Sequence, residues 1–193
     1  MSELELRLLT VEQLEEVYQR HMKRDFPAAE LKPLSILRRL MDSGCYDPYG
    51  FFQGDTLVGY AFFWTAAESP FALLDYLAVV PEQRNNGLGQ AILRELTARF
   101  CQGDRGFFCE AEAPVSGCPA TDSLRQRRLN FYLRCGGRLA EYGSRVFTVP
   151  YRVLSWGPPV EERVLMKYHQ LIYQTSIPKQ MYEENIVIPE VFP

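Results

Sequence analysis

Apolar and polar residues recur with two different periods along the first third of the chain. Residues 4–8 alternate leucine with charged side chains, the period of a half-buried strand. Thr10, followed by Gln13 three residues later, is the signature of a capped helix start. A break at 26–27 precedes a second helical pattern over 34–41, which a Ser-Gly pair ends. We therefore expect one strand followed by two helices.

The middle of the chain is richer in β-branched and aromatic residues. Two strand-like runs, 49–53 and 56–65, flank a Gly-Asp turn and predict a β-hairpin. A third apolar run of strand length covers 71–80. Apolar residues at helical spacing then predict a helix over 87–100.

The remaining elements complete an α+β pattern. Residues 107–113 read as a strand and 123–135 as a helix, and two late strands, 146–154 and 163–168, surround a Gly-Pro-Pro turn. The order β-αα-βββ-α-β-α-ββ predicts about seven strands and about four helices. Residues 1–168 are expected to form a single domain, and 169–193 a C-terminal helix followed by an extended tail, because Pro178, Pro189 and Pro193 interrupt it.

Composition narrows the class of protein. The 193 residues are 47% hydrophobic and 23% charged, which suits one folded domain. There is no apolar run long enough for a membrane span and no basic signal sequence, so we expect a cytoplasmic protein without a membrane partner. A net charge of −3 without a long basic run argues against nucleic acid. The five cysteines lack a CxxC pair, so we expect buried free thiols and no metal.

The most informative segment is 77–93, in which a buried strand passes through a glycine-containing loop into an amphipathic helix. Gly87 and Gly89 leave out side chains at the helix start, so backbone N–H groups can approach an anion. Arg84 adds a positive charge suited to a pyrophosphate. Glycines also occur at helix starts for structural reasons alone, and that alternative stays open for an isolated GxG.

The loop is neither a Walker loop nor a dinucleotide fingerprint, because GK[ST] and GxGxxG are both missing. It resembles the acetyl-CoA loop of the GNAT superfamily of acetyltransferases, [RQ]xxGxG/A after a strand ending near V-x-P. Arg84, Gly87 and Gly89 match that signature, and Val79 and Pro81 precede them at the family's spacing.

A second match to the family lies downstream. The family pattern is close to F/L-Y-x-x-x-G-F at the end of a helix, and Phe131, Tyr132 and Gly136 fit it. Two positions depart from it: Gly137 stands where the family usually has phenylalanine, and Arg125 where asparagine is frequent. Tyr132 is either a core aromatic residue or, as the resemblance implies, a catalytic acid at the thiol end of the cofactor.

The resemblance implies a sandwich-like GNAT fold with a mixed, mostly antiparallel sheet that splays between its fourth and fifth strands. It implies an N-acetyltransferase that moves acetyl from acetyl-CoA, as co-substrate, to a primary amine of a small molecule or peptide by direct attack in a ternary complex. The implied cofactor contacts are Leu77, Ala78, Val79, Arg84, Asn85, Asn86, Gly87, Leu88, Gly89 and Gln90.

An alkyl amine is mostly protonated at neutral pH, so the reaction needs a base. Glu110 is our first choice because it follows an apolar run that would place it near the splay. Glu112, Asp75, His21 and His169 are the other candidates, and each also has an ordinary structural interpretation.

The family chooses its acceptor through the helix-helix loop near 24–32, the segment 114–123 and the late strands. Two other kinds of protein stay open: a non-catalytic acyl-CoA-binding sensor or partner-binding module of GNAT fold, and an α/β protein whose GxG is only a helix start. A homodimer is compatible with the sequence.

Overall fold

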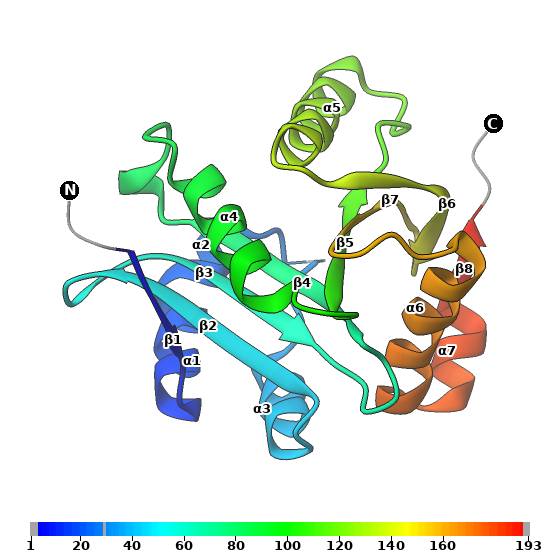
Figure 1. The fold of residues 1–193 in the computed structure, drawn as a ribbon, viewed down its shortest axis with the longest axis horizontal. Coiled ribbons are helices and arrows are strands. Elements are labelled where there is room, and N and C mark those ends of the chain that lie inside the picture. The colour runs from blue at the N-terminus through cyan, green and yellow to red at the C-terminus, as the bar shows by residue number, and fades with distance from the viewer. Residues whose placement is uncertain (1–3, 29, 191–193) are drawn as a thin grey trace. The chain divides into compact units, whose positions relative to one another are not determined.

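The fold is that of a computed structural model, which describes residues 4–28 and 30–190 (Figure 1). The chain forms two compact units. The first contains residues 4–65 and 74–92, and the second contains 66–73 and 93–190. Each unit is built around its own group of neighbouring strands.

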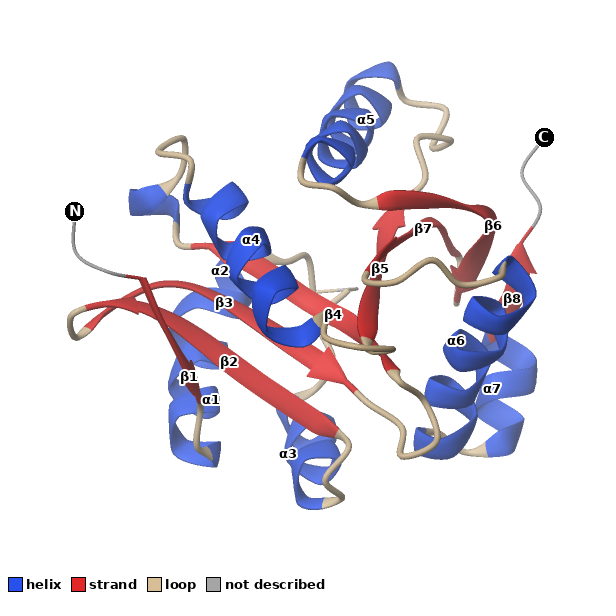
Figure 2. Ribbon diagram, in the orientation of Figure 1, coloured by secondary structure: helices blue, strands red, loops and turns tan. Residues whose placement is uncertain are grey.

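The first unit contains the strands β1 (Leu4–Leu8), β2 (Tyr46–Gln53), β3 (Thr56–Trp64) and most of β4 (Phe71–Val79), in that spatial order (Figure 2). β1 pairs antiparallel with β2, and β2 with β3. The predicted hairpin is confirmed, and its turn contains Gly54 at φ +63°. β2 begins at Tyr46, three residues earlier than predicted.

The helices of the first unit follow the predicted caps. They are α1 (Val11–Val17), a π-helical turn (Tyr18–Met22), α2 (Lys23–Asp25) and α3 (Leu34–Asp42). The Thr10 side chain and Gln13 form the reciprocal capping box. In Figure 1, α1 and α3 lie behind the strands of this unit, and the start of α4 lies in front of them.

The second unit contains the strands β5 (Gly106–Glu112), β6 (Arg138–Val146), β7 (Val149–Trp156) and β8 (Ile186–Glu190), in the spatial order β5-β7-β6-β8 with antiparallel pairs. Its helices are the later part of α4 (Leu88–Phe100), α5 (Pro119–Arg134), α6 (Glu162–Ser176) and α7 (Lys179–Asn185). Phe107 stacks on Trp156 with ring centroids 5.0 Å apart, at the core of this unit.

Three predictions for the last third of the chain are wrong. Residues 163–168 lie in α6 rather than in a strand, because Leu165, His169 and Ile172 are buried at helical spacing. β6 was missed, since Gly143 and charged residues interrupt its alternation. The C-terminal segment begins as a helix, as predicted, but it does not continue as an extended tail.

Instead, that segment forms α7 and then β8, which pairs with β6, and Pro189 is tolerated because β8 is last in the strand order. The predicted boundary at residue 168 falls inside α6. Pro193 lies outside the described residues.

The α+β class with a mostly antiparallel arrangement is confirmed. The described residues contain eight strands, one more than expected, and six helices of seven or more residues. The cysteines are free thiols, but only Cys109 is buried, so the expectation that most are buried is wrong. Within the described part of the chain, no helix is long and apolar enough to cross a membrane.

Candidate functional site

The glycine loop of the first unit leaves an open helix start. After β4 the chain makes a 3₁₀ turn (Pro81–Gln83), and α4 begins at Leu88. Gly87 has φ +75°, and a Cβ built there would meet nothing within 4 Å. The Ala91 N–H donates to the Gly87 carbonyl at 3.1 Å, so the N–H groups before Ala91 have no acceptor inside the helix. This geometry fits a phosphate group.

Gly59 on β3 holds the helix start against the strands, and sequence reasoning did not single it out. A Cβ on Gly59 would lie 2.6 Å from Ile92 Cδ1 of α4 and 2.9 Å from the Ala78 carbonyl oxygen of β4. Only glycine permits such a close approach of helix and strands. Ile92 is fully buried, so its packing fixes the position of the predicted cofactor loop.

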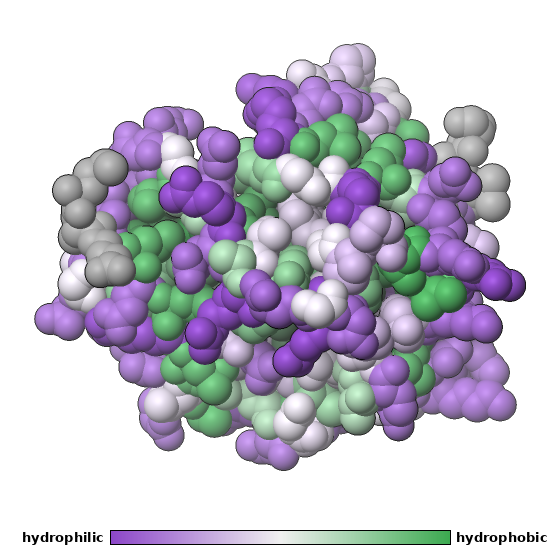
Figure 3. Space-filling model, in the orientation of Figure 1, coloured by the Kyte–Doolittle hydropathy of each residue, from purple (hydrophilic) through white to green (hydrophobic). Residues whose placement is uncertain are grey.

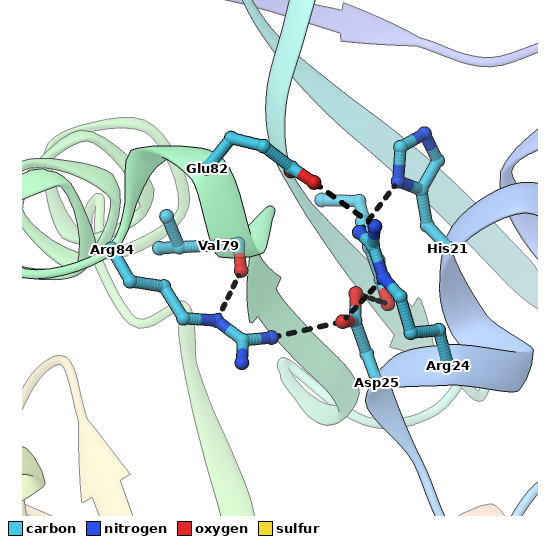
Figure 4. Close-up of polar contacts among 7 residues, drawn as sticks. His21, Arg24, Asp25, Val79, Glu82 and Arg84 are labelled. Atoms are coloured by element: carbon cyan, nitrogen blue, oxygen red, sulfur yellow. Dashed lines mark hydrogen bonds and ion pairs between the residues drawn. The ribbon is translucent and has the colours of Figure 1, made fainter.

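Arg84 is predicted to lie beside a pyrophosphate, and in the structure its guanidinium group is held by protein groups (Figure 4). Its Nε donates to the Val79 carbonyl oxygen at 2.9 Å, and its Nη2 donates to Asp25 at 2.9 Å. The Asp25 side chain is only 2% exposed and also accepts from the Tyr60 hydroxyl at 3.0 Å. Asp25 is therefore the buried partner that orients Arg84, a role that no local sequence pattern indicated.

His21, one of the candidate bases, lies at the edge of this same network. Its Nδ1 is 3.4 Å from the Arg24 guanidinium, which also donates to Glu82 at 3.1 Å (Figure 4). Burial and the Arg24 charge lower the pKa of His21. His21 is thus part of a polar cluster that surrounds the Arg84 anchor.

Tyr132 in the second unit lies in the last turn of α5, which ends before Gly136 at φ +83°. Its ring packs edge-on against Trp156, with centroids 5.8 Å apart. A Cβ on Gly137 would lie 2.7 Å from the Trp156 indole, which explains why glycine replaces the family's usual phenylalanine. The Tyr132 hydroxyl makes no hydrogen bond to the described residues, and burial raises its pKa, so it stays protonated at neutral pH.

Glu110 on β5 and His169 on α6 come together in a buried network. His169 Nε2 lies 3.2 Å from the Glu110 carboxylate, the Tyr173 hydroxyl donates to it at 2.6 Å, and Ser144 also donates to it. Burial alone raises the pKa of Glu110, but the His169 charge and these hydrogen bonds outweigh it and lower the net pKa. The Glu110 carboxylate is therefore ionised and well solvated by protein donors.

The other two candidate carboxylates are also paired. Glu112 forms ion pairs with Arg125 and with Arg128, so Arg125, which departs from the family pattern, holds the end of β5 to α5. Asp75 on β4 accepts from Lys32 at 2.6 Å and from the Tyr46 hydroxyl at 2.6 Å. Within residues 4–28 and 30–190, no three acidic, histidine or cysteine side chains form a group that could hold a metal ion.

The second unit contains an apolar cavity of about 240 Å³ beside α5. The segment predicted to bind the acceptor, 114–123, contributes to its wall with two residues. Figure 3 shows apolar side chains at the surface between α5 and β6. The cavity is lined by Ala113, Pro114, Val115, Gln126, Leu129, Leu133, Leu139 and Arg152.

Comparison with known proteins finds a match to one domain family and to several solved structures. Residues 47–136 match the acetyltransferase (GNAT) domain. A protein from Bacteroides thetaiotaomicron described as a GNAT-family acetyltransferase superposes with a TM-score of 0.68 at 23% identity, covering 88% of this chain and 98% of its own. No curated protein matches the sequence.

Two further solved structures have named activities. Spermidine N-acetyltransferase from Vibrio cholerae, in complex with CoA and spermine, gives a TM-score of 0.57 at 12% identity, covering 79% and 94% of the two chains. The ribosomal-protein-S18-alanine N-acetyltransferase from Escherichia coli gives 0.52 at 16% identity, covering 82% and 97%. At these identities the likeness establishes the fold. The resemblance found in the sequence is thereby confirmed: the chain has the GNAT fold, and residues 47–136 match the GNAT acetyltransferase domain.

Proposed function

We propose that this protein is an N-acetyltransferase that transfers the acetyl group of acetyl-CoA to a primary amine of a small molecule or peptide. The observation that carries the proposal is the open helix start at Gly87, which lies inside the segment that matches the GNAT domain. Backbone N–H groups at a helix start and the positive end of the helix dipole favour a pyrophosphate.

The cofactor contacts follow from this placement. The N–H groups of Gly87, Leu88, Gly89 and Gln90 bind the pyrophosphate, with Asn85 and Asn86 shaping the loop before them. The main chain of Leu77, Ala78 and Val79 binds the pantetheine arm. Because Arg84 already bonds the Val79 carbonyl and Asp25, we assign to Arg84 the role of fixing the loop as well as adding charge.

Transfer proceeds by direct attack of the neutral amine on the thioester carbonyl carbon in a ternary complex. The C–S bond breaks, and Tyr132, which its raised pKa keeps protonated at neutral pH, donates its proton to the departing thiolate and then regains one from solvent. Glu110 is the predicted base. Its lowered pKa means that it is ionised and ready to accept a proton, although it holds that proton weakly, so transfer onward to water completes the step.

Amine acceptors are supported by two of the solved structures, whose names specify spermidine and the alanine of ribosomal protein S18. Both are amines, one in a small molecule and one in a protein. The proposed acceptor of this protein is therefore defined by its primary amine.

The proposal is tested by comparing Gly87→Val with Gly54→Val. Both glycines have positive φ and open space around a built Cβ, so each variant should lose about 1 to 3 kcal/mol of stability. Only Gly87→Val puts a branched side chain where the phosphates approach. Wild type and Gly54→Val should therefore gain roughly 2.7 kcal/mol from acetyl-CoA at 100 times its dissociation constant.

In Gly87→Val we expect acetyl-CoA to bind at least about tenfold more weakly, roughly 1.4 kcal/mol, in calorimetry. Circular dichroism of both variants checks that each is folded. Equal acetyl-CoA affinity in the two valine variants would contradict the placement of the phosphates.

A further inference from the structure

A carboxylate and two aromatic rings of the first unit surround the ammonium group of one of the protein's own lysines. Lys32 Nζ donates to Asp75 Oδ1 at 2.6 Å and lies 5.0 Å from the Trp64 ring centroid and 5.3 Å from that of Tyr76. The other carboxylate oxygen, Oδ2, accepts from the Tyr46 hydroxyl at 2.6 Å. We call Asp75, Tyr46, Trp64 and Tyr76 the Asp75 cluster.

The Asp75 cluster has the chemistry of a site for an organic cation. The Asp75 side chain is 8% exposed, and the three aromatic residues are buried. A desolvated carboxylate gives a strong charge-assisted hydrogen bond to an ammonium group, and aromatic faces attract the same charge. The tyrosine on β2 holds the carboxylate in one orientation, so the site is organised from β2, β3 and β4 independently of the lysine.

Lys32 reaches this cluster from the loop between α2 and α3, and its backbone is anchored separately. The Lys32 N–H donates to the Tyr76 hydroxyl at 2.8 Å, and the Lys32 carbonyl oxygen accepts from the Tyr18 hydroxyl at 3.1 Å. The lysine side chain is 26% exposed. Its ammonium can therefore leave Asp75 by side-chain rotation alone, while the loop backbone stays in place.

We propose that the Asp75 cluster is the binding site for the ammonium group of a primary alkylamine acceptor, and that the Lys32 side chain occupies this site until an acceptor displaces it. The proposal names the acceptor class for the transfer reaction proposed above, and it rests on that function only where turnover is concerned.

Exchange of one ammonium for another keeps the buried carboxylate paired, which avoids the large penalty of leaving Asp75 alone. Acceptors with an anionic group beside the amine are disfavoured, because the site presents a carboxylate.

A binding experiment tests the site without any chemistry. Lys32→Ala keeps Cβ and removes three carbon atoms and the amine, the atoms of n-propylammonium. We expect n-propylammonium to bind Lys32→Ala roughly tenfold or more tightly than wild type in calorimetry, because the internal competitor is gone. Asp75→Asn in the Lys32→Ala background should abolish this binding, and neutral 1-propanol should not bind.

Lys23→Ala is the matched control. Lys23 also places its ammonium over a tyrosine ring, 5.8 Å from the Tyr18 centroid, but it bonds Gln19 rather than a carboxylate. This variant should bind n-propylammonium no better than wild type. If Lys32→Ala does not fold, Lys32→Gln removes the charge and keeps most of the side-chain length. This variant should also bind n-propylammonium more tightly than wild type, with a smaller gain in affinity.

A turnover experiment then separates this proposal from the proposed function. With n-propylamine as acceptor, the bound ammonium gives its proton to the proposed base before the neutral amine attacks, and Lys32→Ala should release CoA with a KM at least about tenfold lower than wild type and a similar kcat. An unchanged KM, or no gain in n-propylammonium binding, overturns the proposal and leaves the Lys32–Asp75 pair as a structural ion pair. Tight n-propylammonium binding without CoA release by any variant supports the cation site and contradicts the acetyltransferase.

Discussion

Removing one oxygen atom from Tyr132 separates chemistry from binding and stability. Tyr132→Phe keeps the ring, which packs edge-on against Trp156 at 5.8 Å and against Phe131 at 5.4 Å. The hydroxyl has no hydrogen-bond partner among the described residues, so its loss should change the free energy of unfolding by no more than about 0.5 kcal/mol.

The expected loss of rate is much larger than the expected loss of stability. General acid catalysis contributes roughly 10²-fold or more, and each tenfold corresponds to about 1.36 kcal/mol, so kcat should fall by the equivalent of at least about 2.7 kcal/mol. Burial raises the pKa of Tyr132 above its ordinary value of 10, so the tyrosine does not titrate near neutral pH. The variant should therefore lower the pH–rate profile without shifting its limbs.

The assay is CoA release at saturating acetyl-CoA and amine, with acetyl-CoA affinity and denaturant unfolding measured on the same samples. Tyr168→Phe is the matched control, because Tyr168 is also a half-buried tyrosine, stacked on Phe71 at 6.0 Å and outside both GNAT motifs. It should change neither rate nor stability. A wild-type kcat for Tyr132→Phe would make this tyrosine a packing residue, and a loss of several kcal/mol would make its hydroxyl structural.

Two further predictions concern the second unit. The ordinary pKa of Glu110 is 4.5 and its folded pKa is lower, so its ionised form stabilises the fold above pH 4.5, and this contribution is lost as the pH falls through the folded value. In denaturant titrations at a series of pH values, the free energy of unfolding of Glu110→Gln should therefore fall less steeply below pH 4.5 than that of wild type. The same fall in both proteins would refute the pairing of ionised Glu110 with His169. Gly137→Ala should cost about 1 to 3 kcal/mol in denaturant unfolding because its Cβ would lie 2.7 Å from the Trp156 indole, and an unchanged midpoint would contradict that contact.

Elements whose residues carry a local signal were predictable from the sequence. The Thr10–Gln13 box, the hairpin turn at Gly54 and the glycine that ends α5 each fix a boundary within a few residues, and all three are confirmed. The prediction of a strand at 163–168 was wrong because six residues are too few to distinguish the two-residue period of a strand from the 3.6-residue period of a helix. Extended to residue 176, the same segment shows helical spacing.

The side-chain networks could not be predicted in the same way. Asp25 and Arg84 are 59 positions apart, as are Glu110 and His169, and no local pattern links either pair. Glu110 and His169 were both candidates, but only the fold brings them together. Gly137 had no explanation in sequence, because the Trp156 ring that fills its space lies on β7, far from Gly137 along the chain.

Transfer of labelled acetyl from acetyl-CoA to a panel of primary amines tests the central claim most directly. The panel should include n-propylamine, a polyamine and a peptide with a free amino terminus, with CoA release and the mass of the product both measured. We expect amine-dependent CoA release and a labelled amide on at least one amine, with both strongly reduced in Tyr132→Phe. Acetyl-CoA binding without transfer to any amine would contradict the proposed acetyltransferase activity. The protein would then be a GNAT-fold module that binds acyl-CoA without catalysis.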